Sequence, residues 1–243
     1  MKRILLFPLF FSLTAMAGDW TAQAEADADR VRVTHPDLAA AIDSLQPIRN
    51  RAGKYFFPGK ELVSEPAQAL LLDRLIRGDD DSEVQVALAY GLVGPLPWAV
   101  IAERPAPVRV ALLEAHKKAD DASALLAGMN DESNEVVAEA VRLLGYSPDT
   151  NAQARSLLER ALSNDSGEVR RLAARSIGWR GHTESFEKVQ ALLDDTRPGV
   201  REAAVRSLGK LDAERAASLP EMVNLANDAH PGTARAVRKV LQR

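Results

Sequence analysis

The sequence predicts an all-α fold, an α-solenoid in which about six helix pairs stack side by side. One stretch recurs along the chain: Glu168–Gly178 returns at Val200–Gly209 and, with more changes, at Val136–Gly145. A period of about 24 to 33 residues is typical of stacked helix pairs and favours binding as the role of the fold. The positions that anchor the repeats are Val84, Val108, Val136, Val169, Val200 and Thr233.

Within the recurring stretch, the apolar residues follow a helical spacing. Counted from Val169, small or apolar side chains stand three, four, seven and eight residues later, whereas Arg171 and Arg175 fall on the opposite side. This is the pattern of an amphipathic helix, not the alternation of a strand. A glycine stands nine residues after three anchors, at Gly145, Gly178 and Gly209, and we expect it to end the helix in a left-handed conformation.

Acidic residues precede most of the anchors. Asp79, Asp131, Asp195 and Asp228 stand five residues before an anchor, and Asp165 stands four before. We expect these carboxylates to cap free amide groups at the start of each helix.

The first seventeen residues have the composition of a signal peptide. Lys2 and Arg3 precede an apolar run over residues 4–13, and small residues then predict cleavage after Ala17. A membrane anchor is the alternative, but the run is shorter than the ~20 residues that a bilayer span needs. We therefore expect export to the periplasm, with no transmembrane segment in the mature chain.

The remaining chain divides into three parts by composition. Residues 18–33 are rich in Ala and Asp, which predicts a loose leader. Residues 34–65 are expected to form an N-terminal helical cap with an aromatic loop at Tyr55–Phe57. This loop either covers the open end of the solenoid or serves in recognition. The repeat domain then occupies residues 66–243.

Two kinds of helix alternate in the predicted repeat domain, joined by short connections. First-type helices are expected over residues 66–77, 97–104, 120–129, 151–162, 184–193 and 212–226. Second-type helices, which carry the anchors, are expected to begin near residues 82, 107, 134, 167, 199 and 232.

The order of Asp, Val-Arg, Ala and Leu-Gly resembles the second helix of HEAT repeats, most closely the short bacterial repeats of phycobilisome lyases. Asp195 with Arg201 and Asp165 with Arg170 match best, and the resemblance covers about three quarters of the chain. It implies a right-handed solenoid and a structural ladder of Asp and Arg between repeats, with Arg109 as a further member.

The first two repeats depart from that pattern. They are shorter, they lack the glycine, and Gln85 stands where the arginine is expected. The resemblance also implies one rival function from the enzyme class, an accessory role like that of a lyase.

No catalytic or metal-binding constellation is recognisable in the sequence. The four histidines, His35, His116, His182 and His230, stand in separate repeats, and there is no cysteine. We therefore predict no catalytic residue, no metal and no cofactor, and we expect His116 to be a hydrogen-bonded packing residue.

Charge is distributed unevenly along the chain. Residues 18–135 carry 12 basic and 20 acidic side chains (−8), whereas residues 136–243 carry 17 and 14 (+3). The net charge of −3 and the aromatic content of 5% argue against nucleic acid as a partner. The sequence makes no prediction of oligomeric state.

Positions two and six after each anchor face solvent on the second-type helices. In the C-terminal repeats they are mostly basic, which predicts a surface that binds an acidic segment of a partner protein. The alternatives are an ordinary solvated helix face, or a site for an anionic envelope polymer or lipid headgroup. The predicted residues are Arg142, Arg171, Arg175, Arg206 and Lys239, with Tyr146 and Trp179 at the helix ends.

The same positions are apolar in the first two repeats. Val86, Tyr90 and Val110 predict a secondary apolar patch. This patch either binds a partner helix or is covered by the Tyr55–Phe57 segment.

Overall fold

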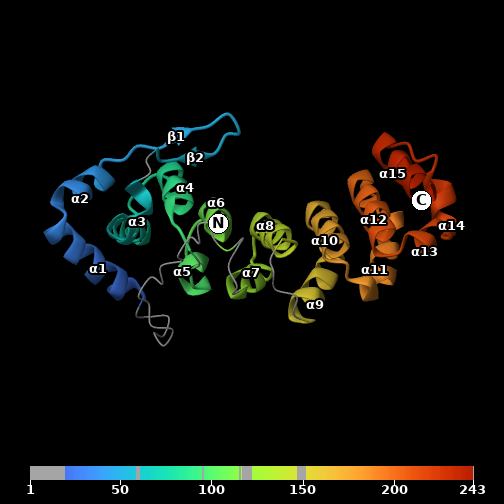
Figure 1. The fold of residues 1–243 in the computed structure, drawn as a ribbon, viewed down its shortest axis with the longest axis horizontal. Helices are drawn as coiled ribbons and strands as arrows, with labels where there is room; N and C mark the ends of the chain where they lie inside the picture. The colour runs from blue at the N-terminus through green and yellow to red at the C-terminus, as the bar shows by residue number, and fades with distance from the viewer. Residues whose placement is uncertain are drawn as a thin grey trace, which may run out of the picture. The chain divides into compact units, whose positions relative to one another are not determined.

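A computed structural model describes residues 20–58, 61–94, 96–114, 116, 122–146 and 152–242. The fold is an all-α solenoid of paired helices with one short β-hairpin, as predicted (Figure 1). The chain divides into two compact units, residues 1–116 and 117–243, so the division falls within the predicted repeat domain. The predicted signal peptide lies outside the described residues.

The N-terminal unit contains two helix pairs, α3 with α4 and α5 with α6, preceded by two helices and the hairpin. The helices are α1 (Trp20–Thr34), α2 (Pro36–Asp43), α3 (Glu65–Arg77), α4 (Ser82–Gly91), α5 (Trp98–Ala102) and α6 (Ala106–Leu113), and the strands are β1 (Ile48–Arg49) and β2 (Tyr55–Phe56). A single 3₁₀ turn, Glu61–Val63, leads into α3.

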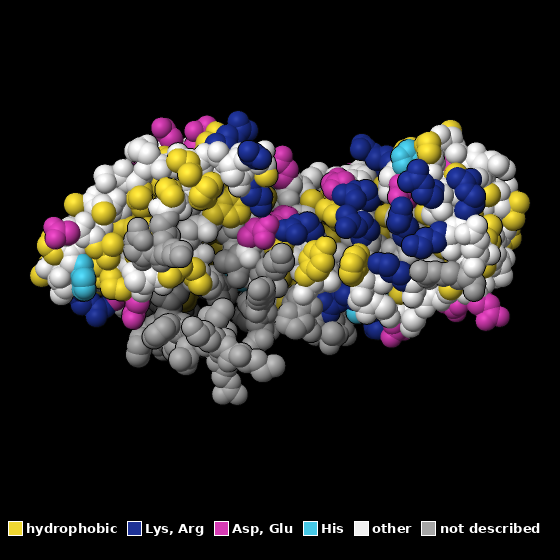
Figure 2. All heavy atoms as spheres, turned by 45° about the horizontal axis from the view of Figure 1, so that its top comes forward, with side chains coloured by type: hydrophobic (Ala, Val, Ile, Leu, Met, Phe, Trp, Pro, Cys, Tyr) yellow, Lys and Arg dark blue, Asp and Glu magenta, His cyan; other side chains and the backbone are white. Residues whose placement is uncertain are grey.

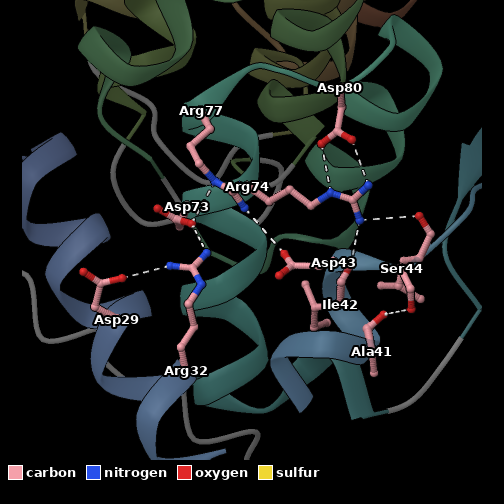
Figure 3. A network of polar contacts seen from close by, with 11 residues as sticks. Asp29, Arg32, Ala41, Ile42, Asp43, Ser44, Asp73, Arg74, Arg77 and Asp80 are labelled. Atoms are coloured by element: carbon pink, nitrogen blue, oxygen red, sulfur yellow. Dashed lines mark hydrogen bonds and ion pairs between the residues drawn. The ribbon is translucent and has the colours of Figure 1, made fainter. Parts of the chain in front are cut away.

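Residues 20–33 form helix α1, so the prediction of a loose leader is wrong for this stretch. Ala24 and Ala28 are buried where α1 packs against α3, and Arg32 donates to the buried carboxylate of Asp73 at 2.5 Å (Figure 3). Alanine has the highest helix propensity and lets helices approach closely. A stripe of alanine is sufficient to bury this helix face, so a composition rich in Ala and Asp does not indicate a loose segment here.

Arg74 joins the N-terminal helices to the first repeat. Its guanidinium donates to Asp80 at 2.8 and 2.9 Å and to the carbonyl of Ile42 at 2.6 Å (Figure 3). Gln85, in the place of the expected arginine, donates to the carbonyls of Asp80 and Gly78. In the first repeat, the side-chain amide of Gln85 therefore holds the turn closed, and the arginine that pairs with Asp80 is Arg74 of α3.

The β-hairpin lies on α4. Its strands are antiparallel with Ile48 opposite Phe56, and Gly53 turns the chain with a φ of 80°. The Tyr55 hydroxyl donates to Glu83 at 2.6 Å, and Phe57 is buried. The aromatic segment therefore packs on the face of α4 in the first repeat, whereas α1 is the helix that packs against α3.

The C-terminal unit contains four helix pairs, whose second-type helices α8, α10, α12 and α15 lie side by side (Figure 1). Its helices are α7 (Ser123–Gly128), α8 (Asn134–Leu144), α9 (Ala152–Ala161), α10 (Gly167–Arg180), α11 (Phe186–Gln190), α12 (Pro198–Leu211), α13 (Ala213–Ala217), α14 (Pro220–Leu225) and α15 (Pro231–Leu241). The one helix expected over 212–226 is two, because Pro220 begins a new helix. Short 3₁₀ turns, Thr183–Ser185 and Ala191–Asp194, flank α11.

The anchors form the core of the stack, as their helical spacing predicted. Val136, Val169, Val200 and Thr233 are at most 1% exposed. Each lies in a second-type helix, α8, α10, α12 or α15. The sequence period therefore identifies the packing face of these helices.

The repeating glycines do not end their helices in a left-handed conformation, so that expectation is wrong. Gly178 and Gly209 lie inside α10 and α12, and Gly145 has a φ of −59°. A Cβ on Gly178 would lie 2.7 Å from the Cβ of Ser207, and one on Gly209 would lie 2.6 Å from Val240. Glycine is required here because the next helix approaches too closely for any side chain.

A serine on the next helix completes this close contact. Ser176 donates to the carbonyl of Val141 at 2.9 Å, and Ser207 donates to the carbonyl of Ala174 at 2.7 Å. Both serines stand seven residues after their anchors and are buried. They tie successive second-type helices together, α8 to α10 and α10 to α12.

The implied ladder is present in the last repeats. Arg170 donates to Asp195 at 2.6 and 3.0 Å, and Arg201 donates to Asp228 at 2.7 and 3.0 Å. Hydrogen bonds from Arg201 hold the pKa of Asp228 below its ordinary value, so the carboxylate stays charged. Arg109, the third implied member, donates to the carbonyl of Arg104 at 2.7 Å.

The aspartates before the anchors do not cap their helices as expected. Asp195 and Asp228 each accept the backbone amide two residues later, which closes the turn, while Asn164 does the same one repeat earlier. Each second-type helix begins after this turn, so the free amide groups of its first turn are out of reach of the aspartate carboxylate. Asn164, not Asp165, is therefore the equivalent position, and Val137 stands where its arginine partner is expected.

Candidate functional site

A groove crosses the exposed face of the second-type helices in the C-terminal unit. It encloses about 580 Å³ and is lined by side chains of α10, α12 and α15. Small residues, among them Gly199, Ala203 and Ala236, contribute to its lining. Lys and Arg side chains gather over this part of the molecule (Figure 2). Its cations are Arg171, Arg175, Arg206, Lys210 and Lys239.

The structure brings the seven residues predicted for partner binding onto one continuous surface. Five of them line the groove: Arg171, Arg175, Arg206, Lys239 and Trp179. The other two, Arg142 and Tyr146, line a smaller hollow that shares Arg175 and Trp179 with the groove. Whether these residues bind a partner stays a prediction.

Three of the predicted arginines pair with a carboxylate on their own helix. Arg142 donates to Glu139, Arg171 to Glu168 at 2.7 Å, and Arg206 to Glu202 at 2.8 Å. The guanidinium of Arg171 lowers the pKa of Glu168, so this carboxylate compensates part of the positive charge.

Arg175 and Lys239 are different. Neither makes a hydrogen bond or ion pair with any residue in the described part of the chain. Arg175 is half-buried and lies where the groove and the smaller hollow meet. Arg175 acts on Glu168 only through its charge, which helps to lower the pKa of that carboxylate. The guanidinium of Arg175 and the ammonium group of Lys239 thus line the groove outside any ion pair among the described residues.

Two aromatic rings border the basic surface. Trp179 is 59% exposed and Tyr146 is 48% exposed, and their ring centroids lie 6.1 Å apart at a tilt of 54°. The ammonium group of Lys210 lies 4.0 Å from the centre of the Trp179 ring, in cation–π contact.

Sequence reasoning missed Lys210 as a member of this surface. The signal was present, because Lys210 stands ten residues after its anchor, as Tyr146 and Trp179 do after theirs. Extending that position to the next repeat identifies it. His230 also lines the groove, with its ring 3.8 Å from Glu202.

The secondary apolar patch of the N-terminal unit is not an open surface. Val86, Tyr90 and Val110 are each half-buried. The ammonium group of Lys54, from the hairpin, lies 4.9 Å from the centre of the Tyr90 ring and 3.6 Å from Glu114. Strand β2 packs on α4. The alternative in which the chain's own aromatic segment covers this face is therefore the one found.

His116 is the buried packing residue that was expected. It is 2% exposed, and its Nε2 accepts the backbone amide of Leu96 at 3.2 Å. Within residues 20–242 as far as they are described, no three His, Asp or Glu side chains are grouped so that they would hold a metal ion. The described helices also include none that is long and apolar enough to cross a membrane.

A family model supports the resemblance recognised in the repeats. The model of HEAT repeats matches residues 119–187 and 154–242, which together exceed half of the chain. The matched range contains the C-terminal groove and the helices that carry it. No curated protein matches the chain.

Comparison with solved structures finds designed armadillo repeat proteins and one enzyme, each at low identity and with a TM-score below 0.5. A designed armadillo repeat protein in complex with the peptide (KR)4 is 23% identical, with a TM-score of 0.43 over 75% of this chain and 84% of its own. Armadillo repeat proteins designed for modular peptide recognition are 19% identical, with a TM-score of 0.46 over 93% and 99%. Human deoxyhypusine hydroxylase with glycerol is 18% identical, with a TM-score of 0.42 over 74% of each chain.

Proposed function

The chain belongs to the HEAT-repeat family, and from this premise we propose that it is a non-catalytic protein-interaction scaffold. Repeat solenoids commonly mediate protein binding, because each repeat adds exposed helix surface to one extended face. The proposed ligand is an acidic segment of a partner protein, bound in the groove across α10, α12 and α15.

The observation that carries this proposal is the excess of cations in a hollow with small residues among its lining. Five Lys and Arg side chains line the groove together with a single carboxylate, Glu202, which is already paired with Arg206. Arginine donates two parallel hydrogen bonds to a carboxylate, which favours acidic side chains as ligands. The glycine and alanine residues of the lining allow a partner backbone to approach closely.

The outer helices of the same unit show a different arrangement of charge. Arg155 pairs with Glu184, Lys188 with Glu159, and Arg215 with Glu187. These pairs link successive first-type helices and neutralise one another. They provide a matched control surface, because they contain the same kinds of cation in the same unit, each paired with a carboxylate of another helix or turn.

The test compares two triple variants with the wild-type protein. One reverses Arg175→Glu, Arg206→Glu and Lys239→Glu in the groove, and the control reverses Arg155→Glu, Lys188→Glu and Arg215→Glu on the outer helices. Both change the net charge equally. Binding of a labelled, disordered peptide of Glu and Ser is measured by fluorescence anisotropy, with circular dichroism to confirm folding.

We expect the groove variant to lose about a hundredfold in affinity and the control variant less than about threefold. Equal losses in both variants would show a general charge effect and would contradict the proposal. Polyphosphate and anionic lipid vesicles serve as further ligands. If these bind through the groove far more tightly than the peptide, the partner is an anionic polymer or membrane surface instead of a protein.

We further propose that the protein acts in the periplasm. The support is the basic, apolar and small-residue order of the first seventeen residues. Mass spectrometry of the protein from a cell fractionation is the test. A chain that begins at Gly18 in the periplasmic fraction is expected, and an unprocessed chain in the cytoplasm would contradict it.

A further inference from the structure

A row of aromatic side chains lies beside the cations of the C-terminal groove. Tyr146, Trp179 and Lys210 each stand ten residues after an anchor, near the C-terminal ends of α8, α10 and α12. The rings of Tyr146 and Trp179 lie 6.1 Å apart, and the ammonium group of Lys210 lies 4.0 Å from the centre of the Trp179 ring. The two rings therefore belong to one continuous surface with the cations.

Both rings of this row are exposed to solvent. Within residues 122–146 and 152–242, the described part of this unit, Tyr146 and Trp179 are the exposed aromatic residues, and the other exposed large apolar side chains are the aliphatic Val223 and Leu241. Tyr, Trp and Arg are the residue types that most often provide the binding energy of a protein interface. Two exposed rings beside unpaired cations therefore indicate a contact for an apolar group of the ligand, in addition to the contacts for its carboxylates.

The smaller hollow between α8 and α10 limits what kind of apolar group can bind. It encloses only about 10 Å³, and Tyr146 and Trp179 contribute to its lining. Gly145, also in the lining, has no room for a side chain, because a Cβ there would lie 2.5 Å from the Oγ of Ser176. A bulky aliphatic side chain thus has no deep cavity to enter. A flat ring can instead lie against the exposed rings, since aromatic pairs attract each other in stacked or edge-to-face arrangements.

The same hollow is bordered by positive charge. Arg142 and Arg175 line it, and Arg175 also lines the groove, where it forms no ion pair with any described residue. A carboxylate bound to Arg175 is therefore next to the place where a ligand ring would lie. The guanidinium can also cover the face of that ring, because arginine stacks on aromatic side chains.

Building on the proposed function, we propose that the partner segment carries an aromatic residue adjacent to its acidic residues. The aromatic ring docks against Tyr146 and Trp179, and the neighbouring carboxylates meet Arg175, Arg206 and Lys239 in the groove. The cations attract any acidic chain by charge complementarity, whereas the two rings distinguish an acidic chain with an aromatic residue from one without.

The experiment compares four labelled peptides of equal length. Three consist of Glu and Ser and differ only at one central position, which is Phe, Leu or Ser; the fourth is the Phe peptide with every Glu replaced by Gln. Fluorescence anisotropy measures their affinities for the full chain as wild type, Trp179→Ala, Tyr146→Ala and Trp179→Phe. Val223→Ala, which shortens an exposed apolar side chain of α14, is the matched control, and circular dichroism confirms folding.

We expect the Phe peptide to bind about tenfold more tightly than the Ser peptide and at least about threefold more tightly than the Leu peptide. In Trp179→Ala and in Tyr146→Ala, the preference for Phe over Ser should fall to less than about threefold, while the Ser peptide binds as it does to the wild type. Trp179→Phe, which keeps a ring, and Val223→Ala should retain the preference.

A Phe peptide that binds no more tightly than the Ser or the Leu peptide would overturn the inference. A preference for Phe that persists in both alanine variants would overturn it as well. Either result leaves the proposed function standing, because the Ser peptide still tests binding through the groove cations. If the Gln peptide binds as tightly as the Phe peptide that contains Glu, acidic side chains do not contribute to binding, and the proposed function fails together with the inference.

Discussion

The two units of this chain build the same kind of face and use it in different ways. In the N-terminal unit, the face of α4 is covered by a hairpin of the chain itself, and Lys54 contacts the position-six residues Tyr90 and Glu114. In the C-terminal unit, the corresponding positions are basic and line a groove. The N-terminal face is thus covered by a segment of the same chain, whereas the basic C-terminal face is complementary to an acidic ligand.

The comparison shows that the positions of a repeat have two different roles, packing between helices and contact with a ligand. Anchors, the glycine and serine contacts and the Arg–Asp ladder hold the helices together, and they are most complete in the last repeats. The side chains at position six are half-buried or exposed and take no part in these contacts, so they vary without affecting the stack. Variants of the packing positions should therefore change stability, and variants of position six should change binding.

The largest stability effect is expected from the ladder. Arg201→Ala leaves the carboxylate of Asp228, 5% exposed, without its guanidinium partner. Removing one member of a buried ion pair costs about 3 kcal/mol in the free energy of unfolding. Urea denaturation measures this. Arg206→Ala, which removes an exposed i,i+4 pair with Glu202, should cost less than about 0.5 kcal/mol.

If Arg201→Ala and Arg206→Ala are equally destabilising, position six contributes to stability, and the distinction between packing positions and position six is wrong.

A smaller loss is expected from Gly178→Val. The new side chain would lie 2.7 Å from the Cβ and 2.8 Å from the Cα of Ser207, so α10 and α12 must move apart. Overpacking of this kind costs about 2 kcal/mol. Gly199→Ala is the control, because its Cβ would make only an ordinary contact of 3.5 Å with Arg171. Thermal denaturation that finds both variants unchanged would contradict the close-approach role of Gly178.

A third variant gives the N-terminal face the charge of the C-terminal face. Tyr90→Arg replaces the cation–π contact of Lys54 with a repulsion between like charges. We expect the hairpin to open more often, by a free energy of about 1 kcal/mol. Hydrogen exchange of the Asn50 amide, which donates to Lys54 within the hairpin, reports this opening. Tyr90→Phe keeps the ring and should exchange at the wild-type rate; unchanged exchange in Tyr90→Arg would show that position six does not hold the hairpin.

The smallest effect is expected from pH. Burial alone would raise the pKa of Asp195, but the hydrogen bonds from Arg170 and from the Arg197 amide, together with the charges of these two arginines, outweigh burial and lower the pKa. The pKa of Asp228 is lowered by hydrogen bonds from Arg201. A depressed pKa stabilises the fold above about pH 4, the unfolded value, and this stabilisation is lost as the pH falls through the folded values. The double variant Asp195→Asn, Asp228→Asn should lose this part of the acid dependence in urea denaturation. An acid dependence that is identical to that of the wild type would contradict it.

The sequence predicted those features that repeat with the helix period. Buried anchors such as Val169, and the common face of Arg175 and Arg206, follow directly from a spacing of 3.6 residues per turn. The ladder between Arg170 and Asp195 followed from the resemblance to a family. These features are local or recur at a fixed distance, which is why a single sequence reveals them.

Contacts between distant segments were not predictable in the same way. Gly178 was assigned to a helix end because glycine has two uses, a left-handed turn and a close approach, and only the position of the next helix distinguishes them. The hairpin cover was one of two alternatives for the same reason. Helix α1 was missed because its buried face consists of alanine, which composition alone does not separate from a loose segment.

The most direct test of the difference between the two faces is an NMR titration of the full chain with a disordered peptide of Glu and Ser. We predict that amide shifts change along α10, α12 and α15, together with the indole N–H of Trp179, while residues 48–56 and α4 stay unchanged. Shifts concentrated on α4 and the hairpin, or spread evenly over both units, would contradict the assignment of partner binding to the basic groove.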